Sequence, residues 1–131
     1  MSGVLVVEDE DMQRTAFVRA LSKLEDCHVT GVASVGAALE AIDAHRPDAI
    51  VSDIGLPDRL GVDLLKELAK RGIDAPILFV TADSTLYRVL VPPEVLLMEK
   101  PVPLATLRET IKVMLGRIPP GRHPEAERLA G

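Results

Sequence analysis

The chain has 131 residues, of which 47% are hydrophobic and 2% aromatic, and its formal net charge at pH 7 is −5. These values predict one globular domain with an aliphatic core, and they argue against a disordered chain. The acidic balance, without a stripe of Lys and Arg, argues against direct nucleic-acid binding. The only cysteine, Cys27, excludes an intrachain disulfide and a cysteine-based zinc site. The N-terminus lacks a basic leader and the apolar runs are too short to span a membrane, so we expect a cytoplasmic protein without membrane contacts.

The first half of the chain predicts two strands, each followed by a helix. Residues 4–7 form an apolar run typical of a buried strand, and residues 29–32 form a weaker one. Ser34 is a suitable N-cap for the second helix, which should end before Pro47 because the residue before a proline leaves the helical region. The inward positions at helical spacing are Met12, Ala16, Phe17, Leu21 and Leu24, then Val35, Ala38, Leu39 and Ile42.

The second half repeats this alternation three more times. Buried strands are predicted at residues 49–51, 77–80 and 95–98. A helix between the first two is expected to end at Gly72, and the last helix is expected to begin at Pro103 and end at Gly116. Residues 82–99 alone separate Thr81 from Lys100, which leaves room for about two helical turns over Ser84 to Leu90. The inward positions of the two longer helices are Leu64, Leu65 and Leu68, then Leu104, Leu107, Ile111 and Leu115.

Strict alternation of strands and helices predicts an α/β domain with a parallel sheet covered by helices on both faces. We expect this domain to span residues 1–116, with a short or irregular fourth helix. Residues 117–131 contain three prolines and two glycines with little apolar content, so we expect a flexible C-terminal tail.

Polar side chains follow four of the predicted strands at the point where each strand ends. They are Glu8 and Asp9, then Asp53, Thr81 and Lys100. Taken singly, each has an ordinary explanation, such as an acidic first turn of a helix or a surface charge. In a parallel sheet, however, all of them lie along one edge, where open α/β sheets bind their ligands.

The chemistry of this group suits Mg²⁺ binding and covalent phosphoryl transfer. Asp9 and Asp53 are the expected direct ligands of Mg²⁺, Glu8 should act partly through water, and the backbone carbonyl of Gly55 is placed to contribute. A carboxylate can accept a phosphoryl group as an aspartyl-phosphate when a cation offsets the repulsion between the two anions. Lys100 and a hydroxyl from Thr81 would then stabilise the transferring oxygens.

Four motifs in this order resemble the receiver domain of two-component response regulators. They are Val-Val-Glu8-Asp9-Glu10, Asp53-Ile-Gly-Leu-Pro57 with Gly61, Val-Thr81-Ala and Lys100-Pro101. The resemblance covers about residues 4–115 and implies a flavodoxin-like sheet of strand order 2-1-3-4-5, with a cis peptide at Lys100-Pro101. It also implies that Asp53 accepts a phosphoryl group from a histidine of a sensor kinase or a histidine phosphotransfer protein. We therefore expect a single-domain response regulator that signals to an unknown downstream protein.

The sequence departs from the family at positions concerned with signal output. The family usually carries an aromatic residue three positions before the strand-5 lysine, whose ring moves with the threonine, and this chain has Leu97 there. Leu60 stands where a small or acidic residue is usual, and the segment after Thr81 is short. Tyr87 is either a movable substitute for the missing ring or a packing residue. We therefore expect phosphorylation at Asp53 with atypical switching of the output face.

Two other functions compete with this interpretation. One is a phosphorylation-independent scaffold or inhibitor with the same fold, which the missing ring favours and the intact acidic cluster opposes. The other is an aspartyl-phosphate enzyme of the haloacid-dehalogenase type, which would need a second acid where this chain has Gly55. The receiver interpretation predicts a signalling protein that catalyses only its own phosphorylation and dephosphorylation.

Overall fold

The computed structural model of this chain describes residues 1–117. Five parallel strands form one sheet in the order β2-β1-β3-β4-β5, which confirms the predicted flavodoxin-like topology. The strands are β1 (Ser2–Val7), β2 (Cys27–Val32), β3 (Ala49–Asp53), β4 (Ile77–Thr81) and β5 (Leu96–Glu99). The helices are α1 (Asp11–Ser22), α2 (Val35–Ala44), α3 (Asp63–Lys70), α4 (Ser84–Tyr87) with the 3₁₀ turn η1 (Arg88–Leu90), and α5 (Leu104–Met114).

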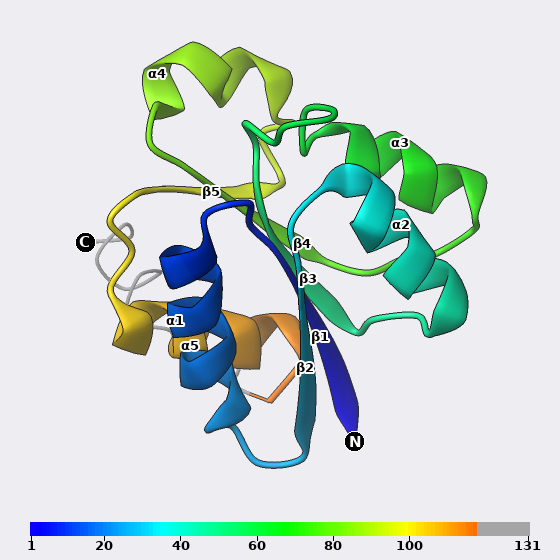
Figure 1. Cartoon of the computed structure of the whole chain (residues 1–131), viewed down its shortest axis with the longest axis vertical. Helices are drawn as coiled ribbons and strands as arrows, with labels where there is room; N and C mark the ends of the chain where they lie inside the picture. Colours follow the sequence, from blue (N-terminus) through cyan, green and yellow to red (C-terminus); the bar gives the residue numbers. More distant parts are fainter. Residues whose placement is uncertain (118–131) are drawn as a thin grey trace.

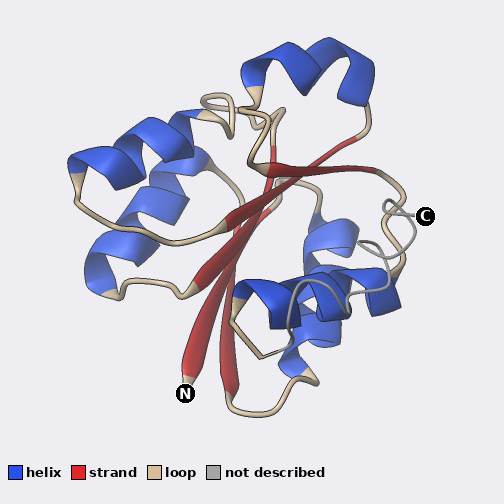
Figure 2. Cartoon of the chain, turned by 180° about the vertical axis from the view of Figure 1, so that it is seen from behind, coloured by secondary structure: helices blue, strands red, loops and turns tan. Residues whose placement is uncertain are grey.

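Helices cover both faces of the sheet, as predicted. Helices α1 and α5 lie on one face, α2 and α3 lie on the other, and α4 lies beyond the end of the sheet near β5 (Figures 1 and 2). Because side chains alternate across a strand, β1 supplies both cores. Val4 and Val6 pack with Phe17 of α1 and Leu107 of α5, whereas Leu5 and Val7 pack with α2 and α3.

The helix boundaries follow local capping chemistry. The Ser34 side chain accepts a hydrogen bond from the amide of Ala37, as its predicted role as an N-cap requires. Glu10 caps α1 by accepting hydrogen bonds from the amides of Met12 and Gln13. Gly72 follows α3 with φ of 65°, a backbone conformation that glycine adopts at low cost.

Three details of the sequence interpretation are wrong. Met12 is 80% exposed and Leu104 is 39% exposed, so neither belongs to the core. The fifth strand is Leu96–Glu99 rather than residues 95–98, and it is not buried. It forms the edge of the sheet, and Leu96 is 45% exposed there.

The fourth helical segment is short, as the spacing predicts: one turn of α-helix in α4 continues into η1. The Lys100-Pro101 peptide is cis, as the family resemblance implies. Arg117, the first residue of the predicted tail, donates hydrogen bonds to the carbonyls of Glu25 and Asp26. The rest of the predicted tail, residues 118–131, lies outside the described residues.

None of the helices within residues 1–117 combines the length and the apolar character that crossing a membrane requires.

Candidate functional site

The predicted site residues meet at the carboxyl edge of the sheet. Glu8 and Asp9 directly follow β1, Asp53 ends β3, Thr81 ends β4 and Lys100 directly follows β5. The register of β1 with β3 pairs Val7 with Ser52, so the next residues along, Glu8 and Asp53, face each other across neighbouring strands. The parallel topology therefore gathers groups that are up to 92 residues apart in sequence.

Lys100 lies between two carboxylates of this group. Its Nζ donates hydrogen bonds to Glu8 Oε1 at 2.5 Å and to Asp53 Oδ2 at 2.8 Å. The backbone amide of Lys100 also donates to the carbonyl of Thr81 at 2.8 Å, which fixes the start of the loop after β5 against β4. The ammonium group is thus held within contact of Asp53 by both its side chain and its main chain.

The other carboxylate oxygen of Asp53 faces the backbone of the following loop. Its Oδ1 accepts hydrogen bonds from the amide of Ile54 at 2.7 Å and from the amide of Gly55 at 3.3 Å. The two oxygens of Asp53 therefore have different environments, one next to a cation and one next to peptide amides. This arrangement fixes the direction in which the carboxylate points.

Gly61 keeps the loop after β3 folded back on Asp53. Its amide donates to the carbonyl of Ile54 at 2.7 Å. A Cβ at this position would overlap the carbonyl oxygen of Asp53, so only glycine permits the close approach. Gly61, which the sequence analysis noted only as part of a motif, thus shapes the backbone at Asp53.

Asp58 is a site-supporting residue that the sequence analysis missed. Its carboxylate accepts hydrogen bonds from the amides of Val35 at 3.0 Å and Gly36 at 2.8 Å, which ties the loop after β3 to the first turn of α2. These backbone hydrogen bonds, chiefly that from Gly36, lower the pKa of Asp58. An aspartate directly after a proline in a loop is typical of turns, but the sequence does not indicate which amides it will bind.

Thr81 is buried at the end of β4, and its hydroxyl oxygen accepts a hydrogen bond from the amide of Asp83 at 3.1 Å. Within residues 1–117 it makes no hydrogen bond with Asp53. The hydroxyl proton can still be donated, because the oxygen uses only its acceptor capacity in this contact.

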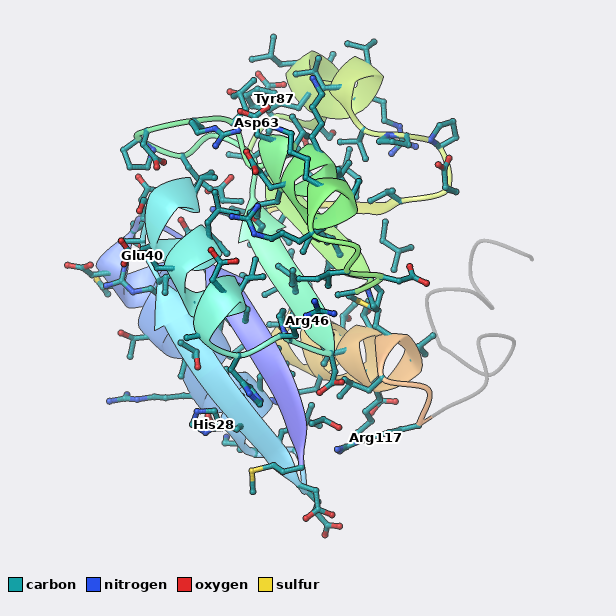
Figure 3. All side chains as sticks on the ribbon, turned by 90° about the vertical axis from the view of Figure 1, so that its right-hand side faces the viewer. His28, Glu40, Arg46, Asp63, Tyr87 and Arg117 are labelled. Atoms are coloured by element: carbon teal, nitrogen blue, oxygen red, sulfur yellow. The ribbon has the colours of Figure 1, made fainter. Side chains whose placement is uncertain are left out.

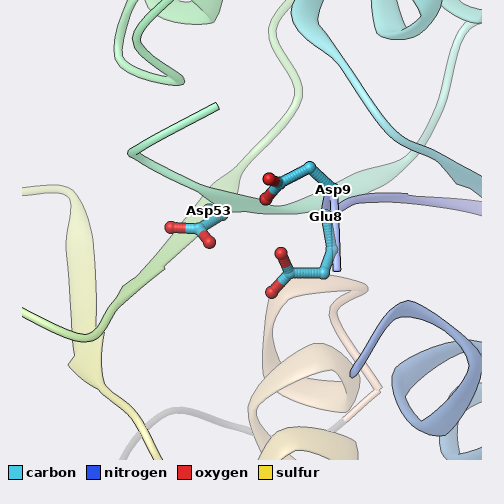
Figure 4. A group of neighbouring side chains, drawn as sticks. All are labelled: Glu8, Asp9 and Asp53. Atoms are coloured by element: carbon cyan, nitrogen blue, oxygen red, sulfur yellow. The ribbon is translucent and has the colours of Figure 1, made fainter. Parts of the chain in front are cut away.

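The acidic residues form a compact group of cation-ligating oxygens. One carboxylate oxygen from each of Glu8, Asp9 and Asp53 lies within 4.8 Å of the others, and Figure 4 shows the three side chains converging. Glu8 is buried, Asp53 is half-buried and Asp9 is exposed. Together with Lys100, the group carries three negative charges and one positive charge, so it attracts a further cation.

Partial burial and pairing shift the pKa values of both Glu8 and Lys100. Burial raises the pKa of Glu8 despite its hydrogen bond with Lys100. Burial alone would lower the pKa of Lys100, but the hydrogen bonds to Asp53 and Glu8 outweigh it, and the pKa of this ammonium is raised. Lys100 therefore stays positively charged at neutral pH.

Comparison with known proteins identifies the family. The family model described as the response regulator receiver domain matches residues 4–112. The response regulator MprA of Mycobacterium sp. (strain KMS) is 33% identical over 130 residues, which are 96% of this chain and 56% of the relative. The transcriptional regulatory protein PdtaR of Mycobacterium tuberculosis is 37% identical over 82 residues, 62% of this chain and 39% of the relative. The chain thus spans roughly a quarter to just over half of the curated relatives that it matches.

Solved structures show the same fold. The receiver domain of the Francisella response regulator 1452 superposes with a TM-score of 0.77 at 25% identity, covering 89% of this chain and 98% of that one. The receiver domain of the hybrid histidine kinase CckA superposes with a TM-score of 0.73 at 28% identity, covering 87% of this chain and 99% of that one. Sequence family, sheet order and the acidic edge of the sheet agree, and the chain belongs to the receiver-domain family of two-component response regulators.

Proposed function

We propose that this receiver domain accepts a phosphoryl group on Asp53 in a Mg²⁺-dependent reaction. The observation that carries the proposal is the environment of the Asp53 carboxylate: the Lys100 ammonium lies 2.8 Å from Oδ2, and two backbone amides contact Oδ1. A carboxylate that only capped a loop would not need a half-buried lysine shared with a buried acid. The donor class is a phosphohistidine of a sensor kinase or of a histidine phosphotransfer protein.

The acidic group fits a Mg²⁺ site by its chemistry. It offers carboxylate oxygens within 4.8 Å of one another, and Mg²⁺ prefers oxygen ligands. Asp9 and Asp53 are the proposed direct ligands, with the Gly55 carbonyl. Glu8 is the proposed indirect partner, because it is the fully buried member of the group and is held in place by Lys100 and by the amide of Glu10. When bound, the ion reduces the repulsion between the Asp53 carboxylate and an anionic phosphodonor.

In the proposed transfer, one oxygen of Asp53 attacks phosphorus while the bond from phosphorus to the donor nitrogen breaks. The donor histidine leaves as neutral imidazole after gaining a proton from solvent. Lys100 contributes a fixed positive charge to the phosphoryl oxygens, and Thr81 contributes its hydroxyl proton, because its contact with Asp83 uses the oxygen only as an acceptor. The amide of Gly55 is a third donor on the same side as Oδ1.

We further propose that the signal of this receiver domain passes through protein–protein contacts. The short α4 and the aliphatic Leu97 support an output that differs from the family's usual Thr–aromatic switching. The same two features support the alternative of a phosphorylation-independent scaffold. The Lys100 ammonium favours phosphorylation, because it contacts both buried Glu8 and Asp53, an arrangement that a scaffold surface does not require.

The test is the intact mass of the protein after incubation with acetyl phosphate, with Mg²⁺ or with EDTA. The expected result is one phosphoryl adduct that needs Mg²⁺ and that is absent from Asp53→Asn. Asp48→Asn is the matched control, because Asp48 lies at the opposite end of the sheet and bonds to the amide of Gly3. It should be phosphorylated like the wild type. If the wild type forms no adduct and binds no beryllofluoride, the proposal is wrong and the scaffold alternative takes its place.

A further inference from the structure

Tyr87 brings the fourth helix close to the loop that follows Asp53. It is the only tyrosine of a chain without tryptophan. A Cβ built on Gly55 would lie 3.4 Å from the hydroxyl oxygen of Tyr87, so this hydroxyl occupies the space beside a residue two positions beyond Asp53. Figure 3 shows Tyr87 at the same end of the molecule as Asp63, the first residue of α3.

The ring of Tyr87 is held by packing, whereas the rest of its helix is not. Tyr87 is half-buried against the core on the α2–α3 face of the sheet, together with Leu97 of β5. Its neighbours in α4 and η1 are exposed apolar residues: Leu86 is 60% exposed, Val89 87% and Leu90 45%. Tyr87 is thus the anchor that joins an exposed apolar segment to the candidate site.

The hydroxyl of Tyr87 has no hydrogen-bond partner among residues 1–117, in contrast to the Lys100 ammonium and the amides of Ile54 and Gly55. A tyrosine hydroxyl is a good donor, and a phosphoryl group brings three strongly accepting oxygens. Gly55 carries no side chain, so the hydroxyl can approach the backbone of the loop that follows Asp53. Phosphorylation of Asp53 would therefore add hydrogen-bond acceptors for the Tyr87 hydroxyl.

We propose that Tyr87 is the residue through which α4 senses a phosphoryl group on Asp53. Its hydroxyl donates to a phosphoryl oxygen from the side of Gly55, and the ring carries α4 and η1 with it. The phosphorylated state favours this position because only that state supplies the acceptor, and a ligand shifts a conformational equilibrium by such a difference in affinity. The exposed apolar side chains of α4 and η1 then change position with phosphorylation. This inference rests on the proposed phosphorylation of Asp53.

Tyrosine fluorescence reports on this residue directly, because no other tyrosine or tryptophan contributes. Emission is followed during incubation with Mg²⁺ and acetyl phosphate, with the mass adduct measured on the same samples. The expected result is a change in emission that grows in proportion to the adduct. It should be absent with Mg²⁺ alone and absent in Asp53→Asn. A full adduct with unchanged emission overturns the role of Tyr87, whereas no adduct in the wild type overturns the proposed function itself.

Tyr87→Phe separates sensing from packing, since it keeps the ring and removes only the hydroxyl. It should form the same adduct as the wild type but lose most of the phosphorylation-dependent amide shifts of α4 and η1 in nuclear magnetic resonance spectra. Leu86→Ala is the matched control, as it changes an exposed neighbour on the same helix, and it should keep those shifts. Wild-type shifts in Tyr87→Phe would show that the hydroxyl plays no part and would refute the inference.

Discussion

Replacement of Asp9 by Asn should stabilise the protein without Mg²⁺ and remove its stabilisation by Mg²⁺. Asp9 is the exposed member of the acidic group and has no ion pair among the described residues. Two carboxylates, those of Glu8 and Asp53, repel it, whereas the single positive charge of Lys100 attracts it. The substitution preserves shape and removes one negative charge, so it relieves a net repulsion.

The magnitude follows from the separation of the charges. Because the ligand oxygens lie within 4.8 Å of one another, one uncompensated pair of like charges costs about 1 kcal/mol in bulk water and about 3 kcal/mol at an effective dielectric constant near 20. Asp9 is exposed, so solvent screening favours the lower figure. For a domain of this size, about 1 kcal/mol corresponds to an increase in melting temperature of roughly 3–5 °C.

The assay is thermal unfolding of the wild type, Asp9→Asn and Asp74→Asn, each in EDTA and across a Mg²⁺ titration. Asp74 is exposed, lies outside the acidic group and has no hydrogen bond or ion pair among residues 1–117, so it controls for the change in net charge. Binding at a hundred times the dissociation constant should stabilise the wild type and Asp74→Asn by about 2.7 kcal/mol. The reasoning is refuted if Asp9→Asn melts at a lower temperature than the wild type in EDTA, or if Mg²⁺ raises its melting temperature as much as that of the wild type.

Further substitutions test the supporting residues. Gly61→Ala should lower the free energy of unfolding, measured with denaturant, by about 3 kcal/mol, because the new Cβ overlaps the backbone of Asp53. Gly72→Ala should lower it by only about 1–2 kcal/mol, because Gly72 has φ of 65° but no neighbour within 4 Å. Asp58→Ala should cost about 0.5–1 kcal/mol at pH 7. Since the pKa of Asp58 is lowered on folding, the stability lost in Asp58→Ala should shrink as the pH falls below the ordinary pKa of 3.8. A loss of stability that does not depend on pH would contradict the role of Asp58 as an acceptor for the amides of α2. Lys100→Met should slow formation of the phosphoryl adduct about tenfold or more, because it removes a charged hydrogen bond worth about 1.5–3 kcal/mol. The rate is measured by mass spectrometry, and an unchanged rate would exclude a catalytic role for this lysine.

Much of the fold follows from the sequence because its signals are local. Short aliphatic runs separated by residues at helical spacing determine where strands and helices form, and Ser34 and Gly72 mark helix ends through chemistry within a few residues of each boundary. The order of the strands, in contrast, came from the resemblance to a family. The alternation by itself requires a parallel sheet but allows several strand orders.

The exposure of individual side chains was less predictable. Met12 and Leu104 lie at positions of helical faces that suggest burial, yet both are in the first turn of their helices and are exposed. Leu96 is exposed because it lies on β5, the edge strand of the sheet. Which part of an apolar face is covered depends on the lengths of neighbouring elements, and a periodic pattern does not contain that information.

The chemical groups of the site follow from the residues after each predicted strand, because acids, a hydroxyl and a lysine that follow parallel strands must reach the same edge of the sheet. How these groups pair depends on the folded domain: Lys100 lies between Glu8 and Asp53, Asp58 accepts from the amides of α2, and the Tyr87 hydroxyl lies beside Gly55. These contacts join residues 22 to 92 positions apart. They depend on loop paths and side-chain directions that are set by packing across the whole domain rather than by neighbours in sequence.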